Sequence, residues 1–388
     1  MSATSSVTVE CPAGTITGEP HYFRSIPYAK ARPFADAEKL EPLRIDATGK
    51  HEGLYLTLAT PEARFGADAP VIVYIHGGGY DSGTRFDART EPTFFREQGF
   101  VVVSIDYRVG LEGFARFHDD EANRYRGIDD CVLALEWVQK NIEHFGGDPT
   151  NVTLIGQSAG AGIALWLTRL DHYKGAFRRL VALSPSFPRQ PFAARKGALR
   201  RALGKPVTRA SLAGIKPARL EKGYRRFTVL ALGPTPDDPN ELADIDLIIS
   251  STRDEMYGHR AGLWFDQRGF GAKLAARLFG LENSDTYIKE ARKIDNRVVG
   301  RMIGDAVIRR YVAQTEKGWW MEFPGKHCDD LSLVFLEDSE AHRHIASFAR
   351  GATPSWPQYS EENRAALSLV SGEAKVVKDP LRMVRLAF

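Results

Sequence analysis

The chain has 388 residues, of which 43% are hydrophobic, and its formal net charge is only +3. A chain of this length and composition can bury a large core, so we predict a single domain over residues 1–388. No apolar stretch approaches the roughly 20 residues that span a bilayer, the N-terminus lacks a secretory leader pattern, and the three cysteines lie far apart, so we expect a cytoplasmic protein without disulfides.

Strand-like runs alternate with helical stretches along the chain, which is typical of doubly wound α/β folds. This order predicts an α/β protein with a mostly parallel central β-sheet flanked by helices. The predicted strands are Val71–Ile75, Phe100–Ile105, Val152–Ile155, Leu180–Ser184, Leu247–Ser250 and Leu331–Phe335.

A glycine-rich loop follows the first of these strands, with the sequence His76-Gly77-Gly78-Gly79-Tyr80. Backbone N–H groups that converge on one point stabilise the oxyanion of acyl transfer, and the loss of one such donor costs about 3–4 kcal/mol. We select Gly78 and Gly79 as candidate donors and interpret His76 as a structural residue that bonds the loop backbone. Taken alone, the glycines are also consistent with an ordinary flexible turn.

A nucleophile elbow is predicted at Gly156-Gln157-Ser158-Ala159-Gly160, directly after the run Val152–Ile155. In a G-x-S-x-G motif, the strand turns sharply into a helix and raises the serine hydroxyl above the edge of the sheet. The flanking positions are glycine because the turn is strained and backbone passes close by. We therefore assign Ser158 as the nucleophile and Ala159, the residue after it, as the third oxyanion donor.

A basic segment runs from Arg189 to Arg226. It contains twelve Lys and Arg residues and one acidic residue, Glu221, so its net charge is +11. It is interpreted either as a solvated helical insertion whose charges pair with acidic neighbours, or as a basic roof that attracts anionic esters or an acidic surface. Its only aromatic residues, Phe192 and Tyr224, offer little stacking surface, so we expect no nucleic-acid partner.

Almost from end to end, the chain resembles the type B carboxylesterase family of α/β-hydrolases. The resemblance implies the α/β-hydrolase fold, with helices that roof the active site. It is weakest over two cap-like insertions, about 187–227 and 264–316, and the chain is short for the family, so we expect reduced helical caps. The matching segments are Phe23–Ala29, Glu52–Leu56, Asp106–Gly110 with Gly113-Phe114, Ala134–Ile142, Phe145–Pro149, Asn151–Thr153, Trp356–Tyr359 and Val376–Pro380.

The resemblance also implies the rest of a catalytic triad, because an acid and then a histidine follow the serine along α/β-hydrolase chains. The segment 252–255 is similar to the family's acid loop, so Glu255 is predicted as the triad acid, with Asp254 as the alternative. His327 stands in a segment similar to the family's histidine loop. It would take the Ser158 proton, and the acid would orient the imidazole.

Three residues depart from the family pattern. Gln157 stands where many members have glutamate, which weakens any preference for cationic substrates. Cys328 stands where glycine is common, and it is interpreted as a small buried hydrophobe or as an accessible thiol. Gly53 replaces the usual first-loop cysteine. The C-terminal segment Ala365–Phe388 is interpreted as a docking helix or a dimer contact.

These residues predict a serine carboxylesterase that acts on a small-molecule ester and needs no metal ion and no organic cofactor. The alternatives are an amidase or carbamate hydrolase with the same triad, or a non-catalytic binding relative. We expect a monomer or a homodimer, no membrane span, and a mild preference for neutral or anionic acyl esters.

Overall fold

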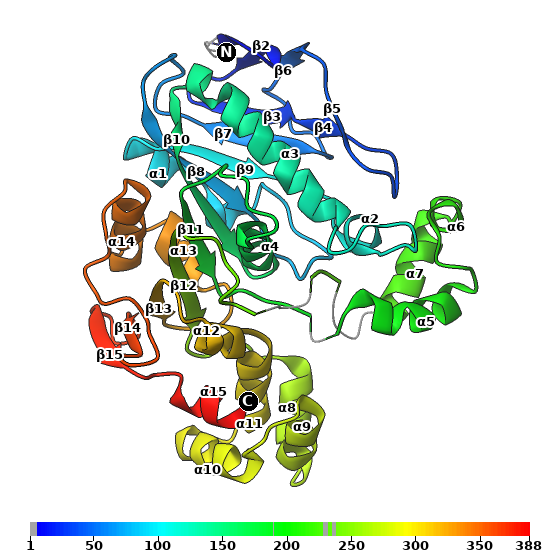
Figure 1. Cartoon of the computed structure of the whole chain (residues 1–388), viewed down its shortest axis with the longest axis vertical. Helices are drawn as coiled ribbons and strands as arrows, with labels where there is room; N and C mark the ends of the chain where they lie inside the picture. The colour runs from blue at the N-terminus through cyan, green and yellow to red at the C-terminus, as the bar shows by residue number, and fades with distance from the viewer. Residues whose placement is uncertain (1–5, 189, 228–231, 235–237) are drawn as a thin grey trace, which may run out of the picture.

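The structure is a computed structural model that describes residues 6–188, 190–227, 232–234 and 238–388 (Figure 1). A ten-stranded sheet forms its centre, and the strands follow one another across it in the order β15 (Lys375–Lys378), β14 (Ala365–Ser368), β13 (Trp319–Phe323), β12 (Asp246–Thr252), β11 (Arg179–Leu183), β10 (Gly147–Gln157), β8 (Ala69–Ile75), β9 (Val101–Ile105), β7 (Tyr55–Ala59) and β3 (Tyr22–Pro27). The pairs between β14 and β9 are parallel, and the pairs at both edges are antiparallel. The predicted mostly parallel sheet is therefore confirmed.

Smaller sheets and the helices surround this centre. One small sheet holds β1 (Val7–Cys11), β2 (Gly14–Gly18) and β6 (Leu43–Asp46), and another holds β4 (Ala29–Lys30) and β5 (Glu38–Lys39). The α-helices are α1 (Thr93–Glu97), α2 (Gly110–Phe114), α3 (Arg126–Asn141), α4 (Ala159–Thr168), α5 (Phe192–Leu203), α6 (Arg209–Ala213), α7 (Pro217–Phe227), α8 (Arg260–Asp266), α9 (Gly271–Phe279), α10 (Ser284–Ile294), α11 (Val298–Gly304), α12 (Arg310–Gln314), α13 (Asp330–Phe335), α14 (Glu340–Ala349) and α15 (Arg382–Ala387).

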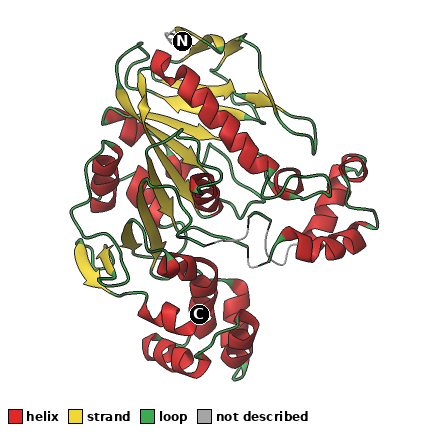
Figure 2. Ribbon diagram, in the orientation of Figure 1, coloured by secondary structure: helices red, strands yellow, loops and turns green. Residues whose placement is uncertain are grey.

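Helices cover both faces of the sheet (Figure 2). Along β8, Val71 and Val73 belong to the core that includes residues of α3 and α4, while Ile72 and Tyr74 belong to the core that includes residues of α1, α13 and α14. Because successive side chains of a strand point to opposite faces, a strand buried on both faces is apolar at almost every position. This explains why the central strands are continuous apolar runs in the sequence.

Five of the six predicted strands are confirmed, as β8 to β12. The sixth prediction is wrong, because Leu331–Phe335 lies in helix α13. Its buried residues are Leu331, Val334 and Phe335 in addition to Asp330, which is the three-to-four spacing of a helix face. A run of four apolar residues and one serine fits a strand as well as a helix. The strand of this region is β13, which is buried throughout and was missed.

Two helical lobes are inserted at the ends of neighbouring parallel strands. The lobe of α5, α6 and α7 follows β11 and occupies the predicted insertion 187–227, of which Arg189 lies outside the described residues. The lobe that starts with α8 follows β12 and covers the predicted insertion 264–316. Figure 1 shows the first lobe projecting to the right and the second forming the lower end of the molecule.

The C-terminal segment Ala365–Phe388 is not one docking helix. It forms the hairpin of β14 and β15 and then the short helix α15, which packs against α10 and α12. The docking-helix alternative was therefore wrong about the first half of the segment, where the strand pairing of β14 with β13 extends the central sheet. Within the described part of the chain, no helix combines the length and apolar character needed to cross a membrane.

Candidate active site

Ser158 stands at the turn between β10 and α4, with φ 53° and ψ −118°. This left-handed conformation is strained for a residue with a side chain, and such strain is typical of a nucleophile elbow. The glycines on either side are required because the neighbouring backbone leaves no space for a Cβ. A Cβ on Gly156 would lie 2.4 Å from the carbonyl oxygen of Gly160, and a Cβ on Gly160 would lie 2.1 Å from the carbonyl oxygen of Ile75.

The structure brings the three predicted triad residues together. His327 Nε2 lies 2.8 Å from Ser158 Oγ, and His327 Nδ1 lies 2.7 Å from Glu255 Oε2. With its proton on Nδ1, where Glu255 accepts it, the imidazole presents an unprotonated Nε2 to the serine hydroxyl. The arrangement has the nucleophile, base and orienting acid in hydrogen-bond contact, which is the geometry of an activated serine.

Glu255, rather than Asp254, meets the histidine. The second carboxylate oxygen of Glu255 accepts a hydrogen bond from the backbone N–H of Thr252 at 2.8 Å, so both oxygens are engaged. The backbone N–H of His327 donates to the carbonyl of Glu255 at 2.9 Å, which joins the acid loop to the histidine loop. Asp254 faces elsewhere and pairs with Arg301 at 2.7 Å.

The glycine loop after β8 passes beside the nucleophile. A Cβ on Gly77 would lie 3.1 Å from Ser158 Cβ, and Gly78 and Gly79 have φ of 114° and 63°. The carbonyl of Gly78 accepts the backbone N–H groups of Asp81 and Ser82, which folds the loop back on itself. Gly78 and Gly79 directly follow Gly77 in this loop, and their N–H groups remain candidate oxyanion donors together with that of Ala159 at the start of α4.

His76 is part of the scaffold of this loop. Its Nδ1 lies 2.7 Å from the carbonyl oxygen of Gly77, and its ring stacks on that of Tyr107 with the centroids 4.4 Å apart. Burial lowers the pKa of His76 below its ordinary value, so the ring is held neutral at pH 7. These contacts agree with the structural interpretation of His76.

Two carboxylates act on the pKa of His327. Burial by itself lowers this pKa, but the hydrogen bond and the negative charge of Glu255, with a further contribution from Asp330, raise it above its ordinary value. Asp330 has no exposed surface, and burial raises its own pKa to about 7. Its hydrogen bond to Ser184 Oγ is long, at 3.5 Å. Sequence reasoning missed Asp330, although it lies three residues after His327.

The two departures beside the nucleophile and the base contact each other. The side-chain amide of Gln157 donates a hydrogen bond to Cys328 Sγ at 3.2 Å. Cys328 has a φ of 75°, a conformation that favours glycine. Burial raises the pKa of its thiol, so the neutral thiol dominates at pH 7. A neutral amide, bonded to a neutral thiol, therefore stands where a glutamate would add negative charge.

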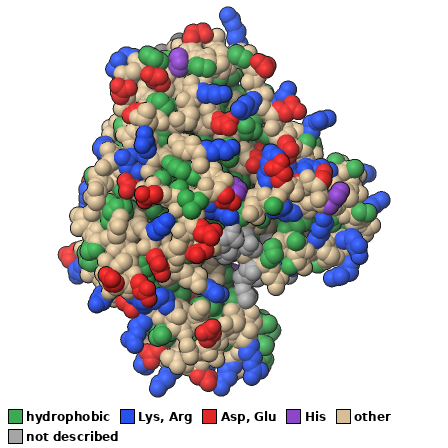
Figure 3. Space-filling view, viewed as in Figure 1, with side chains coloured by type: hydrophobic (Ala, Val, Ile, Leu, Met, Phe, Trp, Pro, Cys, Tyr) green, Lys and Arg blue, Asp and Glu red, His purple; other side chains and the backbone are tan. Residues whose placement is uncertain are grey.

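The basic segment forms the expected helical insertion, but only some of its charges pair with acidic neighbours. Arg209 pairs with Asp119 and Asp120, and Arg225 pairs with Glu221 in its own helix. Figure 3 shows Lys and Arg side chains gathered over the lobe of α5, α6 and α7. The cations of this lobe that have no ion pair with any described acid are Lys196, Arg200, Arg201, Lys205, Lys216, Arg219 and Lys222.

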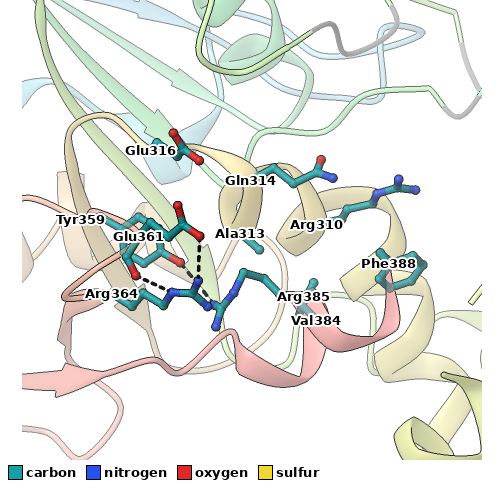
Figure 4. A pocket seen from close by; sticks show the side chains of 10 residues that line it. All are labelled: Arg310, Ala313, Gln314, Glu316, Tyr359, Glu361, Arg364, Val384, Arg385 and Phe388. Carbon is teal, nitrogen blue, oxygen red and sulfur yellow. Dashed lines mark hydrogen bonds and ion pairs between the residues drawn. The ribbon is translucent and has the colours of Figure 1, made fainter. Parts of the chain in front are cut away.

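Two hollows of the described part of the chain are lined by residues other than the triad. A crevice of about 870 Å³ lies between α7 and the loop after β8, where Asp81 and Tyr224 are among its lining residues. A pocket of about 280 Å³ lies near the C-terminal residue (Figure 4). Its Arg364 faces Glu361, and its Arg385 pairs with Asp379. Among the residues that the structure describes, no group of three or more His, Cys, Asp and Glu side chains is arranged to hold a metal ion.

Part of the chain is similar to known esterases. Residues 29–204 match the model of the carboxylesterase family. The chain is 32% identical over 209 residues to the probable N-octanoylanthranilate hydrolase AqdA2 of Rhodococcus erythropolis, which covers 46% of each chain. It is 47% identical over 110 residues to the cocaine esterase of Oryctolagus cuniculus, which covers 28% of this chain and 20% of that one. The chain spans about half, or less, of the length of the curated relatives that it matches.

Solved structures match over nearly the whole chain. The carboxylesterase EST55 of Geobacillus stearothermophilus has a TM-score of 0.77 at 25% identity, covering 97% of this chain and 99% of that one. A PNB esterase has a TM-score of 0.78 at 23% identity, covering 97% and 98%. These likenesses confirm the predicted α/β-hydrolase fold.

Proposed function

We propose that this chain, whose residues 29–204 match the model of the carboxylesterase family, is a serine esterase that hydrolyses small-molecule carboxylic esters. The observation that carries the proposal is the chain of two short contacts from Ser158 Oγ to His327 Nε2, at 2.8 Å, and from His327 Nδ1 to Glu255 Oε2, at 2.7 Å. A serine hydroxyl is a weak nucleophile unless a base takes its proton, and this arrangement supplies the base.

In the proposed mechanism, Ser158 Oγ attacks the ester carbonyl carbon while its proton passes to His327 Nε2. Glu255 stabilises the imidazolium that forms. The carbonyl oxygen becomes an oxyanion, which accepts hydrogen bonds from the N–H groups of Gly78, Gly79 and Ala159. The imidazolium then gives its proton to the departing alcohol oxygen and leaves an acyl-enzyme. His327 next removes a proton from water, which attacks the acyl carbon and releases the carboxylic acid and the free serine.

The test compares Ser158→Ala with Ser251→Ala on p-nitrophenyl esters from acetyl to octanoyl. Ser251 is a matched control, because it is also fully buried and its hydroxyl has no hydrogen-bond partner among the described residues. We expect Ser158→Ala to lower kcat by about 10⁴-fold or more and Ser251→Ala to leave it unchanged. Equal activity of Ser158→Ala and wild type would contradict the proposal.

Amide hydrolysis is the second candidate, because one relative is named for an N-acyl substrate, N-octanoylanthranilate. The same triad and oxyanion donors serve both reactions, so the triad does not distinguish them. Rates measured on a phenyl ester and an anilide of the same octanoyl group separate the two. A higher kcat/KM for the anilide would make the chain an amidase.

We further propose a single domain, a cytoplasmic location, a monomer or homodimer, and no nucleic-acid partner. We also propose that the unpaired cations of α5, α6 and α7 favour neutral or anionic esters over cationic ones. The check is kcat/KM for neutral and anionic esters at low and high salt. The absence of any salt-sensitive difference between them would reject this preference.

A further inference from the structure

Helix α9 exposes large apolar side chains and buries small ones. Its buried face consists of Gly271, Ala272, Ala275 and Ala276, while Leu274 is 40% exposed. Phe270, one turn before Leu274, is 61% exposed. An amphipathic helix of a soluble protein normally turns its large apolar residues toward the core. The outward face of α9 is therefore not explained by the packing of its own lobe.

The neighbouring helix α8 adds a third apolar side chain. Trp264 is 49% exposed, and the guanidinium of Arg268 lies over its ring, 3.5 Å from the centroid. Helices α8 and α9 are in contact, so Trp264, Phe270 and Leu274 belong to one pair of packed helices. Single exposed apolar residues are ordinary, but several large ones on one helix pair indicate an interaction surface.

The charges around these side chains are positive. Residues 260–280 contain Arg260, Arg268, Lys273 and Arg277 against one acid, Asp266. Asp266 is turned inward, where its carboxylate accepts hydrogen bonds from backbone N–H groups at the start of α11. Lys273 lies 3.7 Å from Asp285, in a pair so exposed that water screens it. We call Trp264, Phe270, Leu274 and the four cations the α8–α9 surface.

The α8–α9 surface and the basic lobe arise at one edge of the sheet. Strands β10, β11 and β12 are parallel, and Ser158, the lobe of α5 to α7 and the segment that leads into α8 follow their carboxyl ends in turn. Both insertions therefore start at the edge of the sheet where the nucleophile stands.

We propose that the α8–α9 surface, assisted by the unpaired cations of α5 to α7, docks this chain on an anionic lipid bilayer. Lys and Arg beside exposed Trp, Phe and Leu are the combination that holds amphipathic helices at a membrane interface, with the cations near lipid phosphates and the apolar groups among the acyl chains. The cations of the first lobe add long-range attraction to the negative surface.

Two other occupants fit less well. In a two-fold contact with a second copy, the same patch is used on both molecules. The positive patch that holds Arg268, Lys273 and Arg277 would then face an equally positive patch. A nucleic acid would need open aromatic faces for its bases. Arg268 already occupies one face of the Trp264 ring, and Phe192 of the basic lobe is only 2% exposed.

The test is co-sedimentation of the full chain with vesicles of phosphatidylcholine alone, or of equal parts phosphatidylcholine and phosphatidylglycerol, at low and high salt. We expect binding to the mixed vesicles to be at least about tenfold tighter than to phosphatidylcholine and to weaken with salt. Leu274→Glu should weaken it about tenfold. The matched control is Leu43→Glu, because Leu43 is 44% exposed on β6, at the opposite end of the molecule (Figure 1).

Further variants separate the two components of the docking surface. Phe270→Gln tests the apolar component at a site that precedes α9, in case Leu274→Glu disturbs the helix. Lys222→Glu tests the basic lobe, with the exposed Lys140→Glu on α3 as its control. Binding is measured without substrate, so its outcome does not depend on the proposed esterase activity. An unchanged far-ultraviolet circular dichroism spectrum shows that each variant is folded.

Several results would overturn the proposal. One is equal binding to both kinds of vesicle, and another is an equal loss of binding in Leu43→Glu and Leu274→Glu. A third is binding of a fluorescent single-stranded oligonucleotide by a chain that ignores anionic vesicles. A fourth is a dimer that Leu274→Glu dissociates while neither protein binds vesicles, which would assign the surface to a second copy.

Discussion

Glu255→Gln isolates the orienting role of the triad acid with almost no change in volume. Both groups that Glu255 contacts are donors: the Thr252 backbone N–H at 2.8 Å and His327 Nδ1 at 2.7 Å. A carboxylate offers one oxygen to each, whereas glutamine has one oxygen and one NH₂ group. The amide NH₂ must therefore face one of the two donors. If it faces His327, the imidazole moves its proton to Nε2 and no longer accepts the Ser158 proton.

The expected loss in kcat for Glu255→Gln is about 10³- to 10⁴-fold, which corresponds to about 4–5.5 kcal/mol of transition-state stabilisation. The assay is kcat and kcat/KM on p-nitrophenyl acetate, with the fold checked by circular dichroism. Asp254→Asn is the matched control, since Asp254 pairs with Arg301 and not with His327, and it should change kcat by less than about threefold. If Asp254→Asn lost as much activity as Glu255→Gln, or Glu255→Gln retained most of its activity, the reasoning would be refuted.

Three further predictions concern the loop, the base and the scaffold. Gly78→Ala places a Cβ 2.2 Å from the carbonyl oxygen of Ser82 and should lower kcat by about 10²- to 10³-fold. The control Gly175→Ala, also at positive φ but in open space, should leave kcat unchanged. Equal kcat values in the two variants would contradict the donor role. The raised pKa of His327 should place the acid limb of the kcat/KM profile above about pH 6.5, because only the neutral imidazole accepts a proton, and a midpoint below that value would contradict it. Asp130→Asn breaks the ion pair between Arg108 and the fully buried Asp130, and it should cost about 3–5 kcal/mol in urea denaturation. Asp129→Asn breaks the more exposed pair with Arg124 and should cost less than about 1 kcal/mol; equal losses would show that burial does not set the cost.

Local motifs were enough to predict much of the site. The strain at Ser158 and the close approach of backbone at Gly156 and Gly160 require particular residue types at fixed spacing, so the elbow is legible in the sequence. The same holds for the glycine loop at Gly78 and Gly79. Continuous apolar runs predicted the central strands, because strands covered on both faces have few polar positions.

Other features depended on contacts between distant segments. The segment Leu331–Phe335, which has four apolar residues and Ser332, fits a strand or a helix, and only packing against the sheet selected the helix. The position of Asp330 beside the triad depends on that helix. Glu255 and Asp254 are adjacent in sequence, and the backbone bond between the acid loop and the histidine loop decided which carboxylate meets His327.

By itself, the sequence determined the reacting groups, the order of the central strands along the chain, and the excess of cations between β11 and β12. Only the tertiary structure decided which of these cations lack acidic partners and which apolar side chains of α8 and α9 face outward. The physical reason is that residue type and local spacing fix backbone strain and strand burial, whereas ion pairing and exposure depend on which distant segments come together.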